Sequence, residues 1–260
     1  MSASAAVAAA MPSNALLSVQ GLAKAFGGIR AVDRVSFDLG AGEMLALIGP
    51  NGAGKTTCFN MVGGQLAPDA GSVTLGGVEL VGLKPEAIWR QGVGRTFQIA
   101  ETFASLTVRE NVQLALLARA SSHLSIAARA PSAYRNEADA LLARCGMTRA
   151  ADQACGTLAY GDAKRVELAL ALASSPSVLL MDEPTAGMSP RSRGRLMELV
   201  ASVVRDSQLA VLFTEHDMDV VFGFADEVIV LDKGRVIATG TPTEVRANRE
   251  VQAVYLGETA

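Results

Sequence analysis

Residues 44–57 read MLALIGPNGAGKTT, and this stretch decides the fold. Its first five residues form a continuous apolar run, which is typical of a strand buried on both faces of a sheet. From Gly49 onward the residues fit G-x-x-x-x-G-K-[ST], in which the glycines let backbone N–H groups curl around a phosphate. A helix is expected to begin near Lys55 and to point the positive end of its dipole at that anion. The stretch therefore predicts a strand, a phosphate-binding loop and a helix within an α/β fold.

The loop also predicts a nucleotide site with bound Mg²⁺. Lys55 is expected to bridge the β- and γ-phosphates as a point charge, and the Thr56 hydroxyl to bind Mg²⁺. The alternative is a chance glycine-rich turn, but the strand before the loop and the helix after it argue against that. The residues expected around the nucleotide are Gly49, Pro50, Asn51, Gly52, Ala53, Gly54, Lys55, Thr56 and Thr57.

A second apolar run, SVLLM at 177–181, leads directly into Asp182 and Glu183. The carboxyl ends of parallel strands face one crevice, so this acidic pair is expected beside the phosphate loop. Asp182 is expected to hold Mg²⁺ directly or through water, and Glu183 to orient and deprotonate an attacking water. The alternative is a solvated acidic turn, which the apolar strand in front of the pair argues against.

Two further polar side chains are expected at the same edge of the sheet. His216 follows LAVLF, a third buried strand at 209–213, and could contact the γ-phosphate and the attacking water. A lone histidine is more often structural, so only its place at a strand end favours a catalytic role. Gln98, in GRTFQ, closes another expected strand and could reach Mg²⁺ or the water, although this signal is weak by itself.

Strand patterns occupy both ends of the chain. Strands expected at 16–20 and 35–39, with a hairpin at 72–80, predict a small antiparallel layer beside a mainly parallel sheet. Residues 227–240 predict another hairpin, and Thr241 is expected to cap a short final helix.

The middle of the chain, from about 102 to 175, has a helical pattern instead. Thr107 and Glu110 form a capping box before one helix, and Gly146 ends another whose apolar stripe includes Cys145. The small and polar residues at 118–134, which include His123, are expected to connect these helices at the surface.

Composition suits one soluble domain with a substantial core, spanning residues 15–260. The net charge is −3, whereas a nucleic-acid binder usually carries a basic excess. The three cysteines have no metal-like spacing, which indicates a reducing compartment. The sequence contains no run of 18 apolar residues, so no membrane span is predicted. Residues 1–14 lack the basic segment of a signal peptide and are expected to be a disordered tail.

The pentapeptide LAYGD, residues 158–162, resembles a phosphate-contacting turn at the start of a helix. Ala159 stands where a serine hydroxyl would be useful. The phosphate loop, Gln98, LAYGD, VLLMDE and His216 follow one another in the order found in the ATP-binding subunits of ABC transporters. From about Leu16 to Glu258 the chain resembles that family.

The resemblance implies a P-loop NTPase with a RecA-like core, an antiparallel β-subdomain and a helical subdomain at about 100–175. Phe26, in KAFGG, matches the aromatic residue on which the family stacks adenine; the alternative is a packed core aromatic. In the family, two ATPase subunits dimerise head to tail, and the signature sequence of one caps ATP held by the other. The signature residues of this chain are Leu158, Ala159, Tyr160, Gly161 and Asp162.

Departures from the usual L-S-G-G-Q signature are informative. Ala159 removes one hydroxyl donor, worth ~1.5–3 kcal/mol when the acceptor is charged, and so weakens the site that faces this signature. Asp162 replaces the usual glutamine, and Ser189 replaces an aspartate that most ABC proteins carry. Lys164 and Arg165, which follow the signature, either steer phosphate or face solvent.

The pattern L-A-Y-G, with GRTFQ, DEPTAGMSP and AVYLGE, resembles the ATPases of branched-chain amino-acid importers and their amide or urea relatives. This implies ATP and Mg²⁺ as cofactors, a peripheral location on the cytoplasmic side of the cell membrane, and no nucleic-acid partner. The implied partners are two transmembrane permease subunits, a second ATPase subunit in a heterodimer or homodimer, and indirectly a periplasmic or extracellular solute-binding protein. The permeases are expected to grip a groove beside Gln98, lined by residues 99–106 with Phe103.

Two other functions are weighed against the importer. Soluble ABC ATPases that act on nucleic acid or ribosomes usually carry a second ATPase domain, a coiled-coil insertion or a zinc hook, and this chain has none of them. A GTPase would need the tetrapeptide N-K-x-D to read guanine, and that tetrapeptide does not occur.

Overall fold

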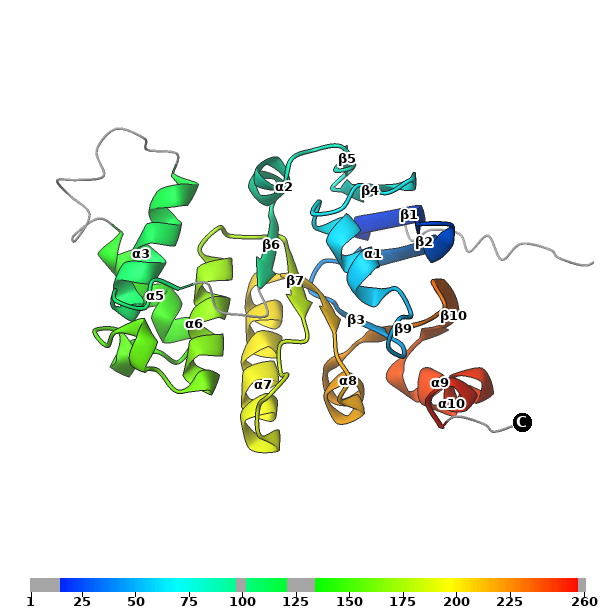
Figure 1. Cartoon of the computed structure of the whole chain (residues 1–260). Coiled ribbons are helices and arrows are strands. Elements are labelled where there is room, and N and C mark those ends of the chain that lie inside the picture. The colour runs from blue at the N-terminus through cyan, green and yellow to red at the C-terminus, as the bar shows by residue number, and fades with distance from the viewer. Residues whose placement is uncertain (1–14, 97–101, 121–133, 257–260) are drawn as a thin grey trace, which may run out of the picture.

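The structure is a computed structural model that describes residues 15–96, 102–120 and 134–256 (Figure 1). Within these residues the strands form two sheets with the orders β10-β9-β3-β8-β7-β6 and β2-β1-β4-β5. The strands of the larger sheet are β3 (Met44–Ile48), β6 (Val93–Thr96), β7 (Val178–Asp182), β8 (Ala210–Thr214), β9 (Glu227–Asp232) and β10 (Arg235–Gly240). The strands of the smaller sheet are β1 (Ala15–Phe26), β2 (Ile29–Gly40), β4 (Ala70–Leu75) and β5 (Val78–Glu79).

The larger sheet is parallel from β9 to β6, and only β10 runs antiparallel to its neighbour. All five residues of β3 are buried. Leu45 and Leu47 join the apolar cluster shared with the smaller sheet, whereas Ala46 and Ile48 join the cluster on the opposite face. Both faces of this strand are therefore covered, which explains why it is apolar at every position.

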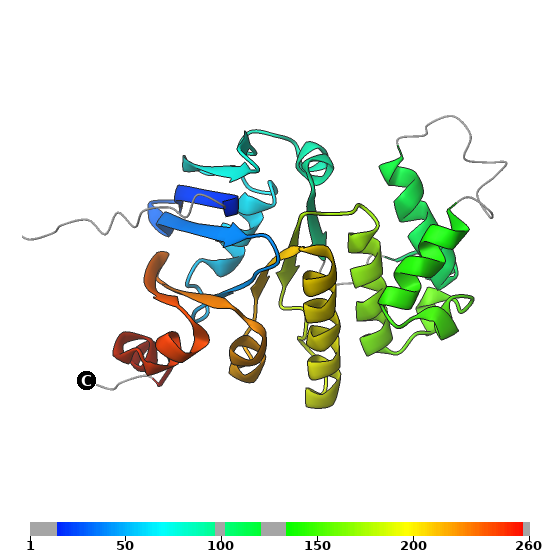
Figure 2. The ribbon, with the colours of Figure 1, turned by 180° about the vertical axis from the view of Figure 1, so that it is seen from behind.

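The helices group by position in the chain. Figures 1 and 2 agree that α3, α5 and α6 lie together at one end of the molecule, and that the antiparallel sheet lies at the other. The helices are α1 (Lys55–Val62), α2 (Pro85–Gln91), α3 (Val108–Arg119), α5 (Arg135–Arg144), α6 (Tyr160–Leu172), α7 (Pro190–Ser207), α8 (Met218–Phe224), α9 (Pro242–Ala247) and α10 (Arg249–Leu256), with short 3₁₀ turns at Thr148–Ala150 and Cys155–Thr157. None of the helices in the described ranges is both long and apolar enough to span a membrane.

The predicted local signals are confirmed in the helical part. The Glu110 N–H donates to the Thr107 hydroxyl at 3.2 Å, and the Glu110 carboxylate accepts the Thr107 N–H at 2.8 Å. Gly146 follows α5 with a φ of +67°, as a helix-ending glycine should. Cys145 is completely buried, so its role is packing.

Three helices differ from the prediction. The helix capped by Thr241 is not the final one, because α10 follows it. The helices α2 and α8 were not predicted, since each has only seven residues and shows less than two full turns of pattern. Their ends carried usable signals: Pro85 begins α2, and the Asp217 side chain caps α8. The expected tail at 1–14, His123 and Gln98 lie outside the described residues.

The capping box of α3 gives a stability prediction. Thr107→Ala removes the hydroxyl that accepts the Glu110 N–H, and should lower the free energy of unfolding by about 1 kcal/mol. Urea denaturation followed by circular dichroism measures the change. Thr107→Ser keeps the hydroxyl and serves as the control; equal stability of the alanine and serine variants would contradict the assignment.

Candidate nucleotide site

A hollow of about 200 Å³ opens where the phosphate loop meets the ends of β7 and β8. It draws on four distant parts of the sequence, and the parallel-sheet argument placed three of them, the loop, Glu183 and His216, in one crevice. The prediction that the loop, Glu183 and His216 lie together is confirmed. The residues that line the hollow are Ala31, Asn51, Gly52, Ala53, Gly54, Lys55, Thr56, Thr57, Glu183 and His216.

Lys55 is buried at the centre of the loop. Its Nζ donates to the Gly49 carbonyl at 2.7 Å and to the Pro50 carbonyl at 3.1 Å. Burial lowers the pKa of Lys55, while the carboxylates of Glu183 and Asp182 oppose that shift and favour the charged ammonium. The loop thus holds a fixed cation where a phosphate group would sit.

Two glycines give the loop its path. Gly49 has a φ of +148°, and a Cβ there would lie 2.2 Å from the Leu231 carbonyl oxygen. Gly54 has a φ of +101°, and a Cβ there would lie 2.2 Å from the Ala31 carbonyl oxygen. Any side chain at either position would clash with backbone, so the loop packs directly against β9 and β2.

The acidic pair is held by the end of β8. The buried Asp182 carboxylate accepts a hydrogen bond from Thr214 Oγ1 at 2.6 Å. The Glu183 N–H donates to the Thr214 carbonyl at 3.2 Å and to Thr214 Oγ1 at 3.1 Å. Glu183 has a φ of +47°, which for a residue with a side chain costs of order 1–3 kcal/mol and must be held by such bonds.

Glu183 and His216 contact each other directly. Glu183 Oε1 lies 2.8 Å from His216 Nε2, a hydrogen bond between two side chains that both line the hollow. The Glu183 side chain is about one-quarter exposed and that of His216 about one-half exposed. A carboxylate and an imidazole are therefore both presented to the space beside the phosphate loop.

The oxygen donors here suit Mg²⁺. Thr56 lies on the hollow, and Asp182 supplies a carboxylate at the adjoining strand end. The described residues contain no cluster of three His, Cys, Asp or Glu side chains that could cage a metal. Mg²⁺ at nucleotide sites is usually held by one or two protein oxygens, phosphate oxygens and water, so these donors fit the ion.

The signature residues lie apart from this hollow. Ala159 is the N-cap of α6 and provides no side-chain cap, because a methyl group cannot accept a hydrogen bond. The Tyr160 hydroxyl donates to the Ala186 carbonyl at 3.1 Å, in the loop after the acidic pair. None of Leu158, Ala159, Tyr160, Gly161 and Asp162 is among the residues that line the hollow.

The prediction that Lys164 faces solvent is wrong. Its side chain is only 6% exposed, and its Nζ bonds the equally buried Glu167 at 2.9 Å. The other alternative, that Lys164 steers phosphate, stays a prediction. Arg165 is about one-quarter exposed, and its Nη1 lies 3.7 Å from the Asp162 carboxylate.

Phe26 ends β1, and its ring is half exposed. The alternative of a packed core aromatic is therefore wrong. The ring is thus accessible at the surface.

Two residues near the site were missed in the sequence. Glu215 is buried and accepts hydrogen bonds from the Thr185 N–H at 2.9 Å and the Thr185 hydroxyl at 2.6 Å, which ties the loop after β7 to β8. Arg95 Nη2 lies 3.8 Å from the Asp182 carboxylate. Arg95 belongs to GRTFQ and Glu215 directly precedes His216, and a charged residue beside an apolar strand was the available signal.

Comparison with known families decides the class of this site. The model of the ABC transporter family matches residues 32–186. This chain belongs to the ABC transporter family. A second model, described as Branched-chain amino acid ATP-binding cassette transporter, matches residues 235–260 of this ABC ATPase.

Similar proteins cover the ATPase almost end to end. The High-affinity branched-chain amino acid transport ATP-binding protein LivG of Escherichia coli K12 is 40% identical over 95% of this chain and 99% of its own length. BraF of Pseudomonas aeruginosa, with the same description, is 37% identical over the same shares of the two chains. The Lipopolysaccharide export system ATP-binding protein LptB of Escherichia coli K12 is 36% identical over 94% and 98%.

Solved structures agree with the fold. The ADP conformation of an ATP-binding cassette of an ABC transporter superposes with a TM-score of 0.85 at 28% identity, covering 95% of this chain and 100% of that one. A nucleotide-free cassette gives 0.83 at 28% identity, covering 94% and 100%. The predicted ABC-ATPase fold is confirmed.

The tight packing at Gly54 predicts a loss of nucleotide binding. Gly54→Ala should weaken ATP binding by more than about tenfold, since the new methyl group must displace the Ala31 carbonyl or the loop. Equilibrium titration with a fluorescent ATP analogue measures the affinity.

Gly194→Ala is the matched control. A Cβ at this position of α7 meets open space, and alanine in a helix should raise stability by about 0.5–1 kcal/mol. Unchanged ATP affinity in Gly54→Ala would show that the loop has more room than its geometry indicates.

Proposed function

We propose that this ABC ATPase powers a multi-component importer of branched-chain amino acids, or of related amides or urea. The observation that carries the proposal is the match of residues 235–260 to the branched-chain amino-acid cassette model. The identity of 40% with LivG over nearly the whole chain supports the same substrate class. The identity with LptB, which belongs to a lipopolysaccharide export system, is lower at 36%.

Hydrolysis is assigned to the hollow beside the phosphate loop. Lys55 and the loop N–H groups would bind the phosphates, while Thr56 and Asp182, with Gln98, would hold Mg²⁺. When bound, Mg²⁺ would neutralise the negative charge that develops on the transferred phosphoryl group. Glu183 takes a proton from the attacking water, and His216, bonded to Glu183 at 2.8 Å, helps to position that water.

The adenine ring is assigned to Phe26. Its half-exposed ring lies at the end of β1, beside the turn into β2, whose Ala31 lines the phosphate hollow. Stacking on an aromatic face suits any nucleobase and contributes without specific hydrogen bonds.

The signature is assigned to the nucleotide of a second ATPase subunit. The N-terminus of α6 offers backbone N–H groups and a positive dipole end, which favour an anion. Because Ala159 offers no hydroxyl, the site that it completes is weaker than one with serine. An unequal pair of sites is what a heterodimer of ATPases would have.

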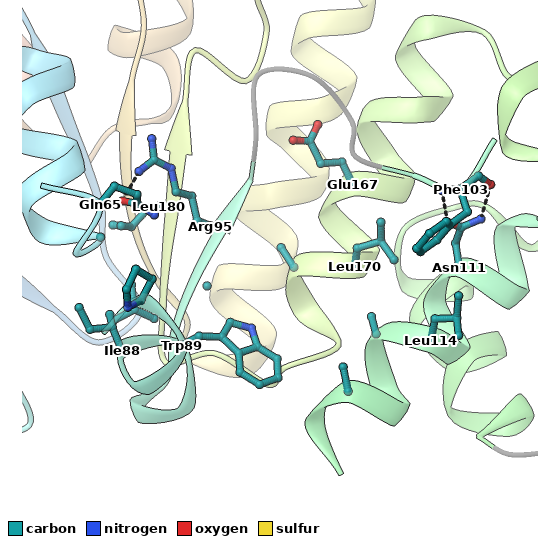
Figure 3. Close-up of a pocket in the computed structure, with 17 residues that line it drawn as sticks. Gln65, Ile88, Trp89, Arg95, Phe103, Asn111, Leu114, Glu167, Leu170 and Leu180 are labelled. Atoms are coloured by element: carbon teal, nitrogen blue, oxygen red, sulfur yellow. Dashed lines mark hydrogen bonds between the residues drawn. The ribbon is translucent and has the colours of Figure 1, made fainter. Parts of the chain in front are cut away.

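The membrane subunits are assigned to a groove between α2, α3 and α6. This cavity of about 450 Å³ is lined mainly by apolar side chains, and Figure 3 shows Trp89 and Phe103 on opposite sides with Leu170 and Glu167 of α6 lying between in this view. Phe103 is 63% exposed and adjoins the other apolar side chains of this cavity, and a contiguous exposed apolar surface indicates an interaction site. The ATPase then sits peripherally on the cytoplasmic face, and a solute-binding protein acts on the other side.

Glu183→Gln tests the chemistry and names the partners together. Glutamine keeps the size of the side chain but cannot accept the proton, so hydrolysis should slow by at least about 100-fold while ATP binding persists. The tagged variant is purified from its own membranes with ATP and Mg²⁺, and mass spectrometry identifies what accompanies it; the nucleotide-free preparation is the control.

Two permeases and a different ATPase would support the heteromeric importer, and the partners' own sequences would indicate the substrate. Recovery with ribosomes, nucleic acid or lipopolysaccharide-export components would overturn it.

Phe103→Asp tests the groove. A carboxylate in an apolar interface is costly to desolvate, so transport should fall by at least about tenfold while ATP affinity stays within twofold of the wild type. Uptake of radiolabelled amino acid by cells that carry the variant measures transport. Val78→Asp introduces the same carboxylate at a half-exposed position on the antiparallel sheet, away from the groove. Cells that carry this variant should show normal transport. Normal transport by Phe103→Asp would remove the groove from the docking surface.

A further inference from the structure

The hairpin that carries Phe26 lacks support from a full sheet at its tip. Phe26 pairs with Ile29 across Gly27 and Gly28, whose φ values are +53° and +88°. The pairing of β1 with β4 ends at Ala23, which faces Ala70. Residues 24–26 therefore run beyond the last strand pair on that side, toward a turn made of the two most permissive residues.

Beyond the end of the β1–β4 pairing, Asp69 makes the hydrogen bonds to β1. Its own N–H donates to the Ala23 carbonyl at 2.9 Å. Its Oδ2 accepts the Ala25 N–H at 2.8 Å, in the place where the next strand acceptor would stand. Its Oδ1 accepts a hydrogen bond from Lys24 Nζ at 2.7 Å. Three consecutive residues of β1 are thus held by one residue.

Lys24 links Asp69 to the Phe26 ring, because it contacts both. Its Nζ lies 5.8 Å from the centre of the Phe26 ring, within the distance at which an ammonium is attracted to an aromatic face. The Lys24 side chain is only 15% exposed, and its charge is paired with Asp69. The hydrogen bonds from Lys24 and from the Ala25 N–H hold the pKa of Asp69 below its usual value, which favours the carboxylate form of Asp69.

We propose that Lys24 and Asp69 are positioning residues, which hold the tip of the β1–β2 hairpin so that the Phe26 ring is preset to stack on the nucleobase. The ammonium covers one face of the ring and leaves the other to the base. A ring that is already oriented loses less conformational entropy on binding, so the ion pair contributes to ATP affinity without touching ATP. The inference rests on the proposed stacking role of Phe26.

The experiment compares a ligand that has a base with one that lacks it. Full-length Lys24→Met and Asp69→Asn are titrated with MgATP and with Mg-tripolyphosphate, each in competition with a fluorescent ATP analogue. Both variants should bind MgATP about 3- to 10-fold more weakly and tripolyphosphate with unchanged affinity. In steady-state hydrolysis the KM for ATP should rise by the same factor while kcat stays constant.

Matched variants separate this role from a general structural one. Lys24→Arg keeps the cation and should restore ATP affinity to within about twofold of the wild type. Lys84→Met makes the same change at an exposed lysine before α2 and should leave both affinities unchanged. Adding Lys24→Met to Phe26→Ala should cause no further loss of ATP affinity, because Lys24 acts through the ring.

The possible failures are distinguishable. If Phe26→Ala binds MgATP normally, the stacking role itself is wrong and the inference falls with it. If Phe26→Ala weakens MgATP binding but Lys24→Met and Asp69→Asn do not, only the inference is overturned. An equal loss of tripolyphosphate affinity in Lys24→Met would likewise overturn it, since the lysine would then act on the phosphates.

Discussion

The structure depends on the close backbone packing of the phosphate loop against its two neighbouring strands. At Gly49 and Gly54 the backbone passes so close to the carbonyls of Leu231 and Ala31 that even a methyl group would overlap them. This contact fixes the loop between β9 of the parallel sheet and β2 of the antiparallel sheet. The two sheets, one with Glu183 at its edge and the other with Phe26, are thereby both held against the same loop. In the proposed binding mode, packing therefore sets the distance between the residues at the two ends of the nucleotide.

The second constraint is the end of β8. Thr214 bonds both Asp182 and the backbone of Glu183, and the next residue, Glu215, bonds Thr185 in the loop after β7. This strand end holds Glu183 in a left-handed conformation that an isolated peptide would avoid. The strain shows that the position of the carboxylate is imposed by its neighbours.

Much of this could be predicted from the sequence because the parallel sheet leaves a strong pattern. The strands β3, β7 and β8 are apolar at nearly every position, and their carboxyl ends must share one edge of the sheet. This pattern predicted that Glu183 and His216 lie close together. The burial of Lys164 could not be predicted in this way. A lysine near the start of a helix is usually exposed, and although Glu167 stands one turn along the same helix, the burial of both side chains depends on what other elements place over that face of α6. The exposure of Phe26 was expected from the family resemblance alone, since the strand pattern does not say whether a strand's last residue lies in the core or at the surface.

The helix α6 has a mechanical consequence. Its first turn carries the signature, while Glu167, Leu170 and Ala171 of the same unbroken helix line the apolar groove. Gly161 and Leu170 are about 14 Å apart along the axis, so a tilt of about 10° at one end displaces the other by roughly 2 Å. A displacement of that size breaks or makes a hydrogen bond to a phosphate oxygen. In the proposed assembly α6 transmits motion as a rigid body. A membrane subunit bound in the groove would tilt the helix and so change its hydrogen bonds to ATP without contacting ATP itself.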